Sequence, residues 1–277
     1  MSIESYKPPV SQLLSYGDCN KMNSGQWPNY VEELGFGEEH ISELIRMATD
    51  ETFFEIEEET DRLDIWAPVH AWRTLAQLKA EAAIEGLTPL LGFNDDWAMG
   101  ELPEVYSLIG PAAIPFLIAH LGDSDAEIYS RAIAIDALEK IGNSYPDFRD
   151  QCVAILTKQL SKFTEQHRDF NGMLVGGLVD LKAVESARVI ERAFATDRVE
   201  PFMVGDWWDV QVEFGLKSKD EVRPESENNY FRSFPNRIDI SEESSTSNYN
   251  LGKLDQKTKA KRKQAKESRK KNRKKRK

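Results

Sequence analysis

The sequence predicts an all-α fold, an α-solenoid of about four stacked helical hairpins. Three observations support this: an internal repeat, a helical spacing of apolar residues, and the placing of Gly and Pro. The repeat is visible in two places. LAQLKA at 75–80 recurs as LVDLKA at 178–183, and AAI at 82–84 recurs thirty positions later at 112–114. The four units that result start near Ala67, Ala98, Glu127 and Arg168.

The spacing of apolar residues within a unit indicates helices rather than strands. Leu75 and Leu78, and then Leu87, Leu90 and Leu91, lie three or four positions apart. A single hairpin of this kind cannot bury its apolar face alone, whereas stacked hairpins share a continuous core. We therefore expect eight helices over 67–195, arranged in consecutive antiparallel pairs.

Gly and Pro fall where such hairpins need turns. We expect Pro68 and Pro103 in first turns, the 109–111 step (IGP) at an inner corner, and Gly92 and Gly122 at helix ends. Two further prolines, Pro89 and Pro115, lie within second helices. Those helices are expected to begin late or to bend.

The repeats divide the chain into four predicted parts. Residues 1–66 form an N-terminal helical cap with an amphipathic helix over 38–48 and a shorter one over 27–34. Residues 67–216 form the repeat domain, which a short helix over 205–215 closes. In that helix we expect Asp206 as N-cap, a buried stripe of Trp207, Val210 and Phe214, and an end at Gly215.

The last two parts are a flexible linker over 217–252 and a disordered basic tail over 253–277. The tail holds 15 Lys and Arg against two acids, a net charge of +13, within a chain of net charge −11. Residues 1–216 hold 16 bases and 38 acids, a net charge of −22. An acidic body thus precedes a basic tail that is too poor in apolar residues to fold alone.

The segment YSLIGPAAIPFL at 106–117 nearly matches the pattern Leu-x-x-Ile-Gly-x-Ala-Ala-Ile-Pro-x-Leu. This pattern resembles the short HEAT-like repeats of about thirty residues first described in phycobilisome lyases, over about residues 67–195. In such families the concave surface of the stack usually binds the partner. The resemblance implies a non-catalytic interaction scaffold or adaptor with a protein partner. The alternative is a lyase, or a lyase subunit, acting on a bilin-like acidic small molecule.

Alignment of the units places Arg73, Glu104 and Asp136 at equivalent first-helix positions. They form either a polar ladder on a ligand face or a set of ion pairs between repeats. Helical spacing gives Trp207 to the core and leaves Trp208 exposed as a partner contact. The candidate protein-binding residues are His70, Arg73, Glu101, Glu104, Asp136 and Trp208.

Enzyme signatures do not favour catalysis, although activity stays open. The chain has no Walker loop and no Gly-x-Gly-x-x-Gly, Gly-x-Ser-x-Gly or His-Glu-x-x-His motif. Cys19 and Cys152 lie far apart, and none of the four His has an i, i+4 partner, so we expect no metal and no cofactor. His70 either is satisfied within the first repeat or has an acid/base role. The acidic stretch 50–64 is either a solvated segment or a docking strip for a basic partner or a divalent cation.

The tail gives the clearest functional signal, because its bases would neutralise phosphates without reading sequence. RNA, DNA, an anionic protein or membrane surface, and the chain's own acidic body are all possible targets, and a purely solubilising tail is the remaining alternative. Without a signal segment or a long apolar run, we expect a soluble cytoplasmic protein. The candidate polyanion-binding residues are Lys261, Arg262, Lys263, Arg269, Lys270, Lys271, Arg273, Lys274, Lys275, Arg276 and Lys277.

Overall fold

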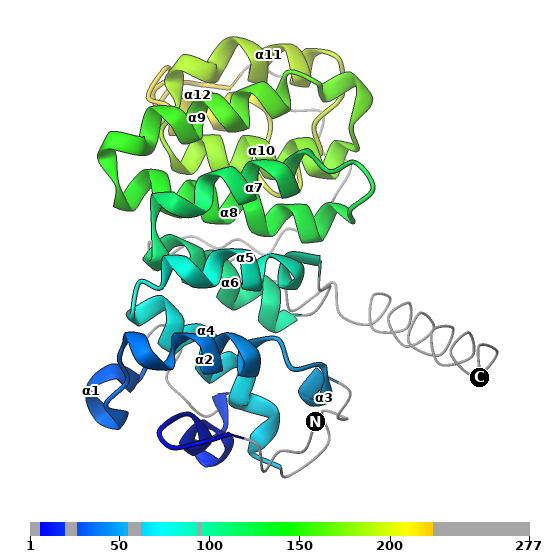
Figure 1. The fold of residues 1–277 in the computed structure, drawn as a ribbon. Helices are drawn as coiled ribbons and strands as arrows, with labels where there is room; N and C mark the ends of the chain where they lie inside the picture. The colour runs from blue at the N-terminus through cyan, green and yellow to red at the C-terminus, as the bar shows by residue number, and fades with distance from the viewer. Residues whose placement is uncertain (1–5, 20–26, 55–61, 93–95, 224–277) are drawn as a thin grey trace, which may run out of the picture. The chain divides into compact units, whose positions relative to one another are not determined.

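The structure is a computed structural model that describes residues 6–19, 27–54, 62–92 and 96–223. The chain separates into two units, Met1–Asn228 and Asn229–Lys277. All described residues belong to the first. They form twelve α-helices joined by turns and short 3-10 helices, and contain no β-strand (Figure 1). The prediction of an all-α fold is confirmed for this part of the chain.

The N-terminal region is made of short helices. Its elements are η2 (Val10–Ser15), α1 (Tyr30–Leu34), η4 (Glu38–His40), α2 (Ile41–Ala48), α3 (Glu51–Phe54) and η5 (Asp64–Trp66). The helix expected over 38–48 begins as the 3-10 turn η4 and continues as α2. Leu44 and Ala48 are buried on its inner face, and Ile41 and Ile45 are half-buried beside them.

Eight α-helices lie among the described residues of 67–195, as the repeat predicts. Their first members start within two residues of the expected unit starts. The elements are α4 (Ala67–Gln77), η6 (Glu81–Ala83), α5 (Ile84–Leu87), η7 (Thr88–Gly92), α6 (Asp96–Ile109), η8 (Pro111–Ala113), α7 (Ile114–Gly122), α8 (Ile128–Ser144), α9 (Pro146–Leu160), η9 (Phe163–Glu165), α10 (Arg168–Asp180), η10 (Val184–Ser186) and α11 (Ala187–Ala195).

The helices pack in two rows. The first helices of the four units, α4, α6, α8 and α10, contact one another in chain order, and α2 extends this row beyond α4. In a second row, α9 contacts α7 and α11. Helices α8 and α10 of the first row also pack against α9 (Figure 1). Glycine allows the close approach within the first row, because a Cβ on Gly177 would lie 2.9 Å from Cγ2 of Ile135.

The two copies of the repeated hexapeptide end their helices with the same turn. Lys79 and Lys182 have left-handed backbones, with φ of 49° and 53°. Each turn closes with the hydrogen-bond pair of a Schellman motif. The amides of Ala80 and Ala183 donate to the carbonyls of Leu75 and Leu178 over 3.0 and 2.9 Å, and those of Lys79 and Lys182 donate to Ala76 and Val179 over 2.9 Å. The sequence repeat is thus a repeated helix ending.

The prolines test the predicted turns. Pro68 lies in the first turn of α4, and Pro115 lies in the first turn of α7, which begins late after η8. The corner at Gly110 has a φ of 106°, which favours glycine. Pro103 is not in a first turn, and that prediction was wrong. Helix α6 begins at Asp96, so Pro103 is its eighth residue and leaves one intrahelical hydrogen bond unmade.

The last helix, α12 (Trp207–Glu213), packs on α11 and begins with a capping box between Asp206 and Asp209. The prediction that Trp207 is buried and Trp208 exposed was wrong, because Trp208 is the more buried of the two. Trp208 is only 8% exposed, and Nζ of Lys217 lies 3.5 Å from its ring centroid. Trp207 is half-buried beside Phe194. The cause is that the chain after α12 turns back over the helix.

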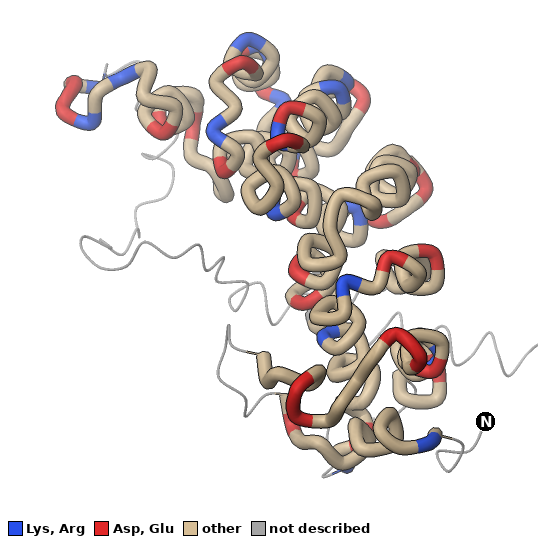
Figure 2. Tube along the Cα trace, turned by 60° about the vertical axis from the view of Figure 1, so that its left-hand side comes forward, with Lys and Arg blue, Asp and Glu red and all other residues tan. Residues whose placement is uncertain are grey.

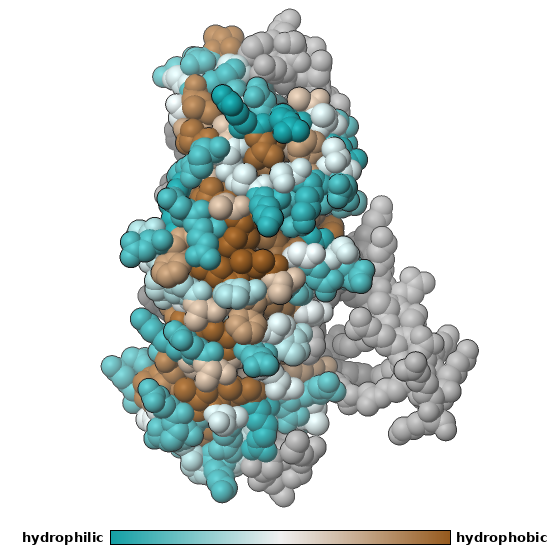
Figure 3. Space-filling view, turned by 45° about the horizontal axis from the view of Figure 1, so that its top comes forward, coloured by the Kyte–Doolittle hydropathy of each residue, from teal (hydrophilic) through white to brown (hydrophobic). Residues whose placement is uncertain are grey.

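Residues 217–223 complete this return, because Arg223 forms ion pairs with Asp206 and Asp209 at the start of α12. The rest of the predicted linker and the whole predicted tail lie outside the described residues. In the face drawn in Figure 3, hydrophobic residues form a broken band between hydrophilic ones.

Among the described residues, one bent pair of helices meets the length and composition criteria for crossing a membrane. No single helix in the part of the chain that the structure describes is long and apolar enough to cross a bilayer. Trp97–Ile109 and Pro111–Gly122 pass the same test together by length and composition, with a bend of 114° between them.

Candidate functional site

Two groups of polar residues lie along the row of first helices. The first, the buried polar cluster, consists of Cys19, Tyr30, His70, Arg73 and Glu101. The second, the acidic row, consists of Glu104 on α6, Asp136 and Glu139 on α8, and Asp180 at the end of α10. Both contain residues that the sequence singles out.

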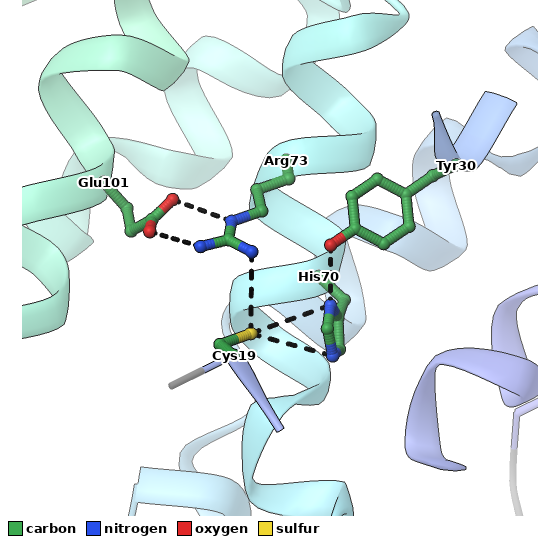
Figure 4. Close-up of polar contacts among 5 residues, drawn as sticks. All are labelled: Cys19, Tyr30, His70, Arg73 and Glu101. Atoms are coloured by element: carbon green, nitrogen blue, oxygen red, sulfur yellow. Dashed lines mark hydrogen bonds and ion pairs between the residues drawn. The ribbon is translucent and has the colours of Figure 1, made fainter. Parts of the chain in front are cut away.

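The buried polar cluster joins three segments of the chain. His70 and Arg73 lie three residues apart on α4 and therefore share one face of that helix. Glu101 reaches the cluster from α6, and Cys19 and Tyr30 reach it from the N-terminal region (Figure 4). The N-terminal region and the first two units thus meet at these five side chains.

The hydrogen bonds of His70 define its tautomer. Its Nε2 lies 3.1 Å from the carbonyl oxygen of Gly17, which can only accept, so Nε2 carries the proton. Its Nδ1 therefore accepts a hydrogen bond from the hydroxyl of Tyr30 over 2.8 Å. Burial lowers the pKa of His70 to about 4, although the Gly17 contact opposes this and the charge of Arg73 adds to it. The ring is therefore neutral at pH 7.

Arg73 and Glu101 form a two-point ion pair between α4 and α6. The guanidinium Nε lies 2.8 Å from Oε2 of Glu101, and Nη2 lies 2.5 Å from Oε1. The two side chains are only 6% and 12% exposed. The ring of Trp27 lies 5.4 Å from Cζ of Arg73. This geometry satisfies both charges internally, so neither is presented to a partner.

Cys19 contacts both basic side chains of the cluster. Its Sγ lies 3.7 Å from each ring nitrogen of His70 and 3.8 Å from Nη1 of Arg73. Burial nevertheless raises the pKa of the thiol to about 12, and Nδ1 of His70 is already occupied by Tyr30. The pair therefore lacks the thiolate and the free base that a cysteine nucleophile needs. The separation of 51 positions between Cys19 and His70 hid this contact from sequence reasoning.

A second pair of nucleophile and histidine, Ser130 and His120, also has the wrong proton arrangement for catalysis. His120 Nε2 lies 2.9 Å from Oγ and 3.2 Å from the carbonyl oxygen of Ser130, so it is the donor. The Ser130 hydroxyl in turn donates to the carbonyl of Leu91 over 2.7 Å. Since Nε2 carries a proton, it cannot accept one from the hydroxyl. The pair ties α8 to α7 and η7.

The acidic row combines exposed and paired carboxylates. Glu104 accepts from Nζ of Lys140 over 3.0 Å, and Glu139 accepts from the amide of Asn143. Asp136 is exposed, yet the surrounding helices desolvate it. That desolvation, with the charge of Glu139, raises the pKa of Asp136 to about 7. The pKa of Glu139 is raised as well, by burial and by Asp180. Four carboxyl groups thus lie along α6, α8 and α10, and two of them keep their protons to a higher pH than usual.

Of the three residues that the repeat alignment makes equivalent, Glu104 and Asp136 lie in the acidic row, whereas Arg73 lies in the buried polar cluster. Arg73 pairs with Glu101, and Glu104 pairs with Lys140, so adjacent units are joined by ion pairs across the row. Asp136 belongs to the acidic row, while Trp208 lies apart from both groups on α12. Sequence reasoning missed Cys19, Tyr30, Glu139 and Asp180 as members, and Lys140 as the partner of Glu104.

Other sequence candidates are only partly described. Within the acidic stretch 50–64, Asp50 accepts from the hydroxyl of Tyr6 over 2.8 Å, while residues 55–61 lie outside the description. All candidate polyanion-binding residues of the tail also lie outside it. The described His, Cys, Asp and Glu contain no group of three or more that could hold a metal ion. Acidic positions occur throughout the described chain (Figure 2).

Comparison with known proteins gives no match to any family model, curated protein or solved structure.

Proposed function

We propose that this chain is a non-catalytic adaptor that binds a basic segment of a partner protein along the acidic row. The observation that carries the proposal is that Glu104, Asp136, Glu139 and Asp180 come from three consecutive first helices. A partner lying across α6, α8 and α10 would meet all four. Lys and Arg side chains are the groups that such a surface attracts and orients.

The raised pKa of Asp136 supports a cationic ligand. A carboxyl group with a pKa of about 7 is partly protonated at neutral pH because desolvation, and after it the charge of Glu139, disfavour the carboxylate. A bound ammonium or guanidinium would supply a counter-charge and favour release of the proton. Binding should therefore strengthen as the pH rises from about 6 to about 8.

The two rows of helices and the repeated helix endings support an α-solenoid of the HEAT-like kind as the body of the adaptor. In this proposal the row of first helices is the binding face. The basic tail adds electrostatic affinity for a polyanion, as its composition predicts.

The lyase alternative is less well supported. It needs His70 and Arg73 to handle an acidic ligand, but both side chains are buried and engaged within the buried polar cluster. No described contact favours it.

A matched pair of variants tests the adaptor proposal. The test variant combines Asp136→Asn, Glu139→Gln and Asp180→Asn. The control combines Glu85→Gln, Asp147→Asn and Glu191→Gln, which removes the same charge from exposed positions on second helices. Fluorescence anisotropy with a labelled poly-lysine peptide at low salt gives the readout.

We expect the test variant to bind about tenfold more weakly than the wild type, because each exposed pair contributes up to about 1 kcal/mol. The control should bind nearly as well as the wild type. Equal losses in both variants would show that only net charge matters and would refute the acidic row as the site.

A further inference from the structure

The N-terminal segment, defined here as the described residues 6–19 and 27–34, covers the helix that begins the row. Both η2 and α1 pack against α4. Every residue of α4 from Ala67 to Ala76 is buried, whereas the first helices α6 and α8 expose polar side chains. Together with α2, the segment thus covers α4, whereas α6 and α8 keep polar side chains at the surface.

His70 is one of the α4 residues that hold both parts of this segment, beside Arg73, which contacts Cys19 and Trp27, and Gln77, which donates to the carbonyl of Pro28. His70 donates to the carbonyl of Gly17 in the first part and accepts from the hydroxyl of Tyr30 in the second. The ring of Tyr16 also meets it edge-on, with 5.2 Å between centroids. One neutral imidazole therefore holds two stretches of chain that are 13 residues apart.

Protonation of His70 disfavours this arrangement. An imidazolium carries protons on both nitrogens, so the contact with Tyr30 would have to reverse, with Nδ1 donating to the hydroxyl oxygen. The added charge would also be buried close to the guanidinium of Arg73.

The other titratable groups around the ring offer no free counter-charge. The N-terminal segment contributes Tyr16, Cys19 and Tyr30, and the carboxylate of Asp18 lies beside Cys19. From α6, Glu101 already holds Arg73 through both oxygens. A positive His70 is thus destabilised by burial and by Arg73.

We propose that His70 is a pH-sensitive latch whose protonation releases the N-terminal segment from α4. Release uncovers the part of α4 around His70 and Arg73, and lets solvent reach the ion pair of Arg73 and Glu101. The inference stands on the buried polar cluster and does not depend on the binding function proposed above.

Hydrogen–deuterium exchange of the full chain, corrected for the intrinsic pH dependence of exchange, tests the latch. Reporter amides in the segment are those of Gln12 and Glu33, which bond to the carbonyls of Pro9 and Asn29. From the pKa of about 4, protection in the segment should fall roughly thirty-fold between about pH 7.5 and about pH 5. Protection in α8 and α10 should change much less, because their packing does not involve His70.

Two variants separate the latch from other effects of acid. His70→Gln keeps a donor and an acceptor but cannot titrate, so it should abolish the pH dependence in the segment. His167→Gln replaces an exposed histidine at the start of α10 and should leave that dependence intact. An unchanged pH dependence in His70→Gln would overturn the proposal, as would an equal loss of protection in α8 and α10 of the wild type.

A direct titration protects the test against misfolding of the His70→Gln variant. In the wild type, the ring-proton NMR signal of His70 should show protonation only together with loss of segment protection. A His70 that titrates with an ordinary pKa of about 6.5 while the segment stays protected would also overturn the proposal.

Discussion

Arg73 of α4 holds both carboxylate oxygens of Glu101 of α6, and this nearly buried pair joins the first unit of the row to the second. The pair Lys140 and Glu104 joins the next two first helices in a similar way, but its side chains are about two-fifths exposed. Of these two ion pairs between described first helices, one is therefore nearly buried and the other exposed. Their energetic weights should differ sharply.

Glu101→Gln should destabilise the protein by about 3 kcal/mol, because it leaves the guanidinium of Arg73 buried without its counter-charge. Glu104→Gln is the matched control and should cost less than about 1 kcal/mol, since solvent screens that pair. Urea unfolding followed by circular dichroism measures both. Similar small losses in the two variants would show that Arg73 is satisfied without Glu101.

Asp136→Asn should change stability in a pH-dependent way. The pKa of about 7 in the folded state lies above the ordinary value of the unfolded state, so between these values the folded protein binds more protons than the unfolded one. The free energy of unfolding therefore falls as the pH rises from about 4 to about 7. The variant should therefore unfold at a higher temperature than the wild type at about pH 8 and at nearly the same temperature at about pH 4. Thermal unfolding at the two pH values checks this. A difference that is greater at low pH would contradict the sign of the shift.

The sequence predicts much of the fold because the repeat constrains it twice, once through apolar spacing and once through helix endings. The copies at 75–80 and 178–183 fold into the same left-handed turn at Lys79 and Lys182. Pro103 and Trp208 were misplaced because a helix start and a returning chain depend on contacts from outside the local segment.

The candidate site was predicted less completely. His70, Arg73 and Glu101 were singled out as partner contacts, yet they are satisfied by one another and by Cys19 and Tyr30. The residues that cover them lie some 40 to 54 positions earlier in the chain. No periodicity connects segments that far apart, so their burial follows only from the tertiary structure.

Lys79→Gly should stabilise the protein by up to about 1 kcal/mol. Lys79 has a φ of 49°, a conformation that costs a non-glycine residue free energy and glycine almost none. Lys158→Gly is the control, because Lys158 is an exposed residue within α9 and glycine there should cost about 1 kcal/mol. Urea unfolding of both variants gives the comparison. Destabilisation by Lys79→Gly would show that the lysine side chain contributes more than the strain it carries.

Deletion of residues 253–277 should separate polyanion binding from folding. The segment carries a net charge of +13 and lacks the apolar residues needed to contribute to a core, so its loss should leave the melting temperature nearly unchanged. Retention on heparin or RNA columns at low salt should be lost, because the remaining chain is strongly acidic. A tail of the same length with its Lys and Arg replaced by Gln separates the effect of charge from that of length. Equal retention of the full and shortened chains would refute polyanion binding by the tail, and a large fall in melting temperature would instead assign it a role in stabilising the acidic body.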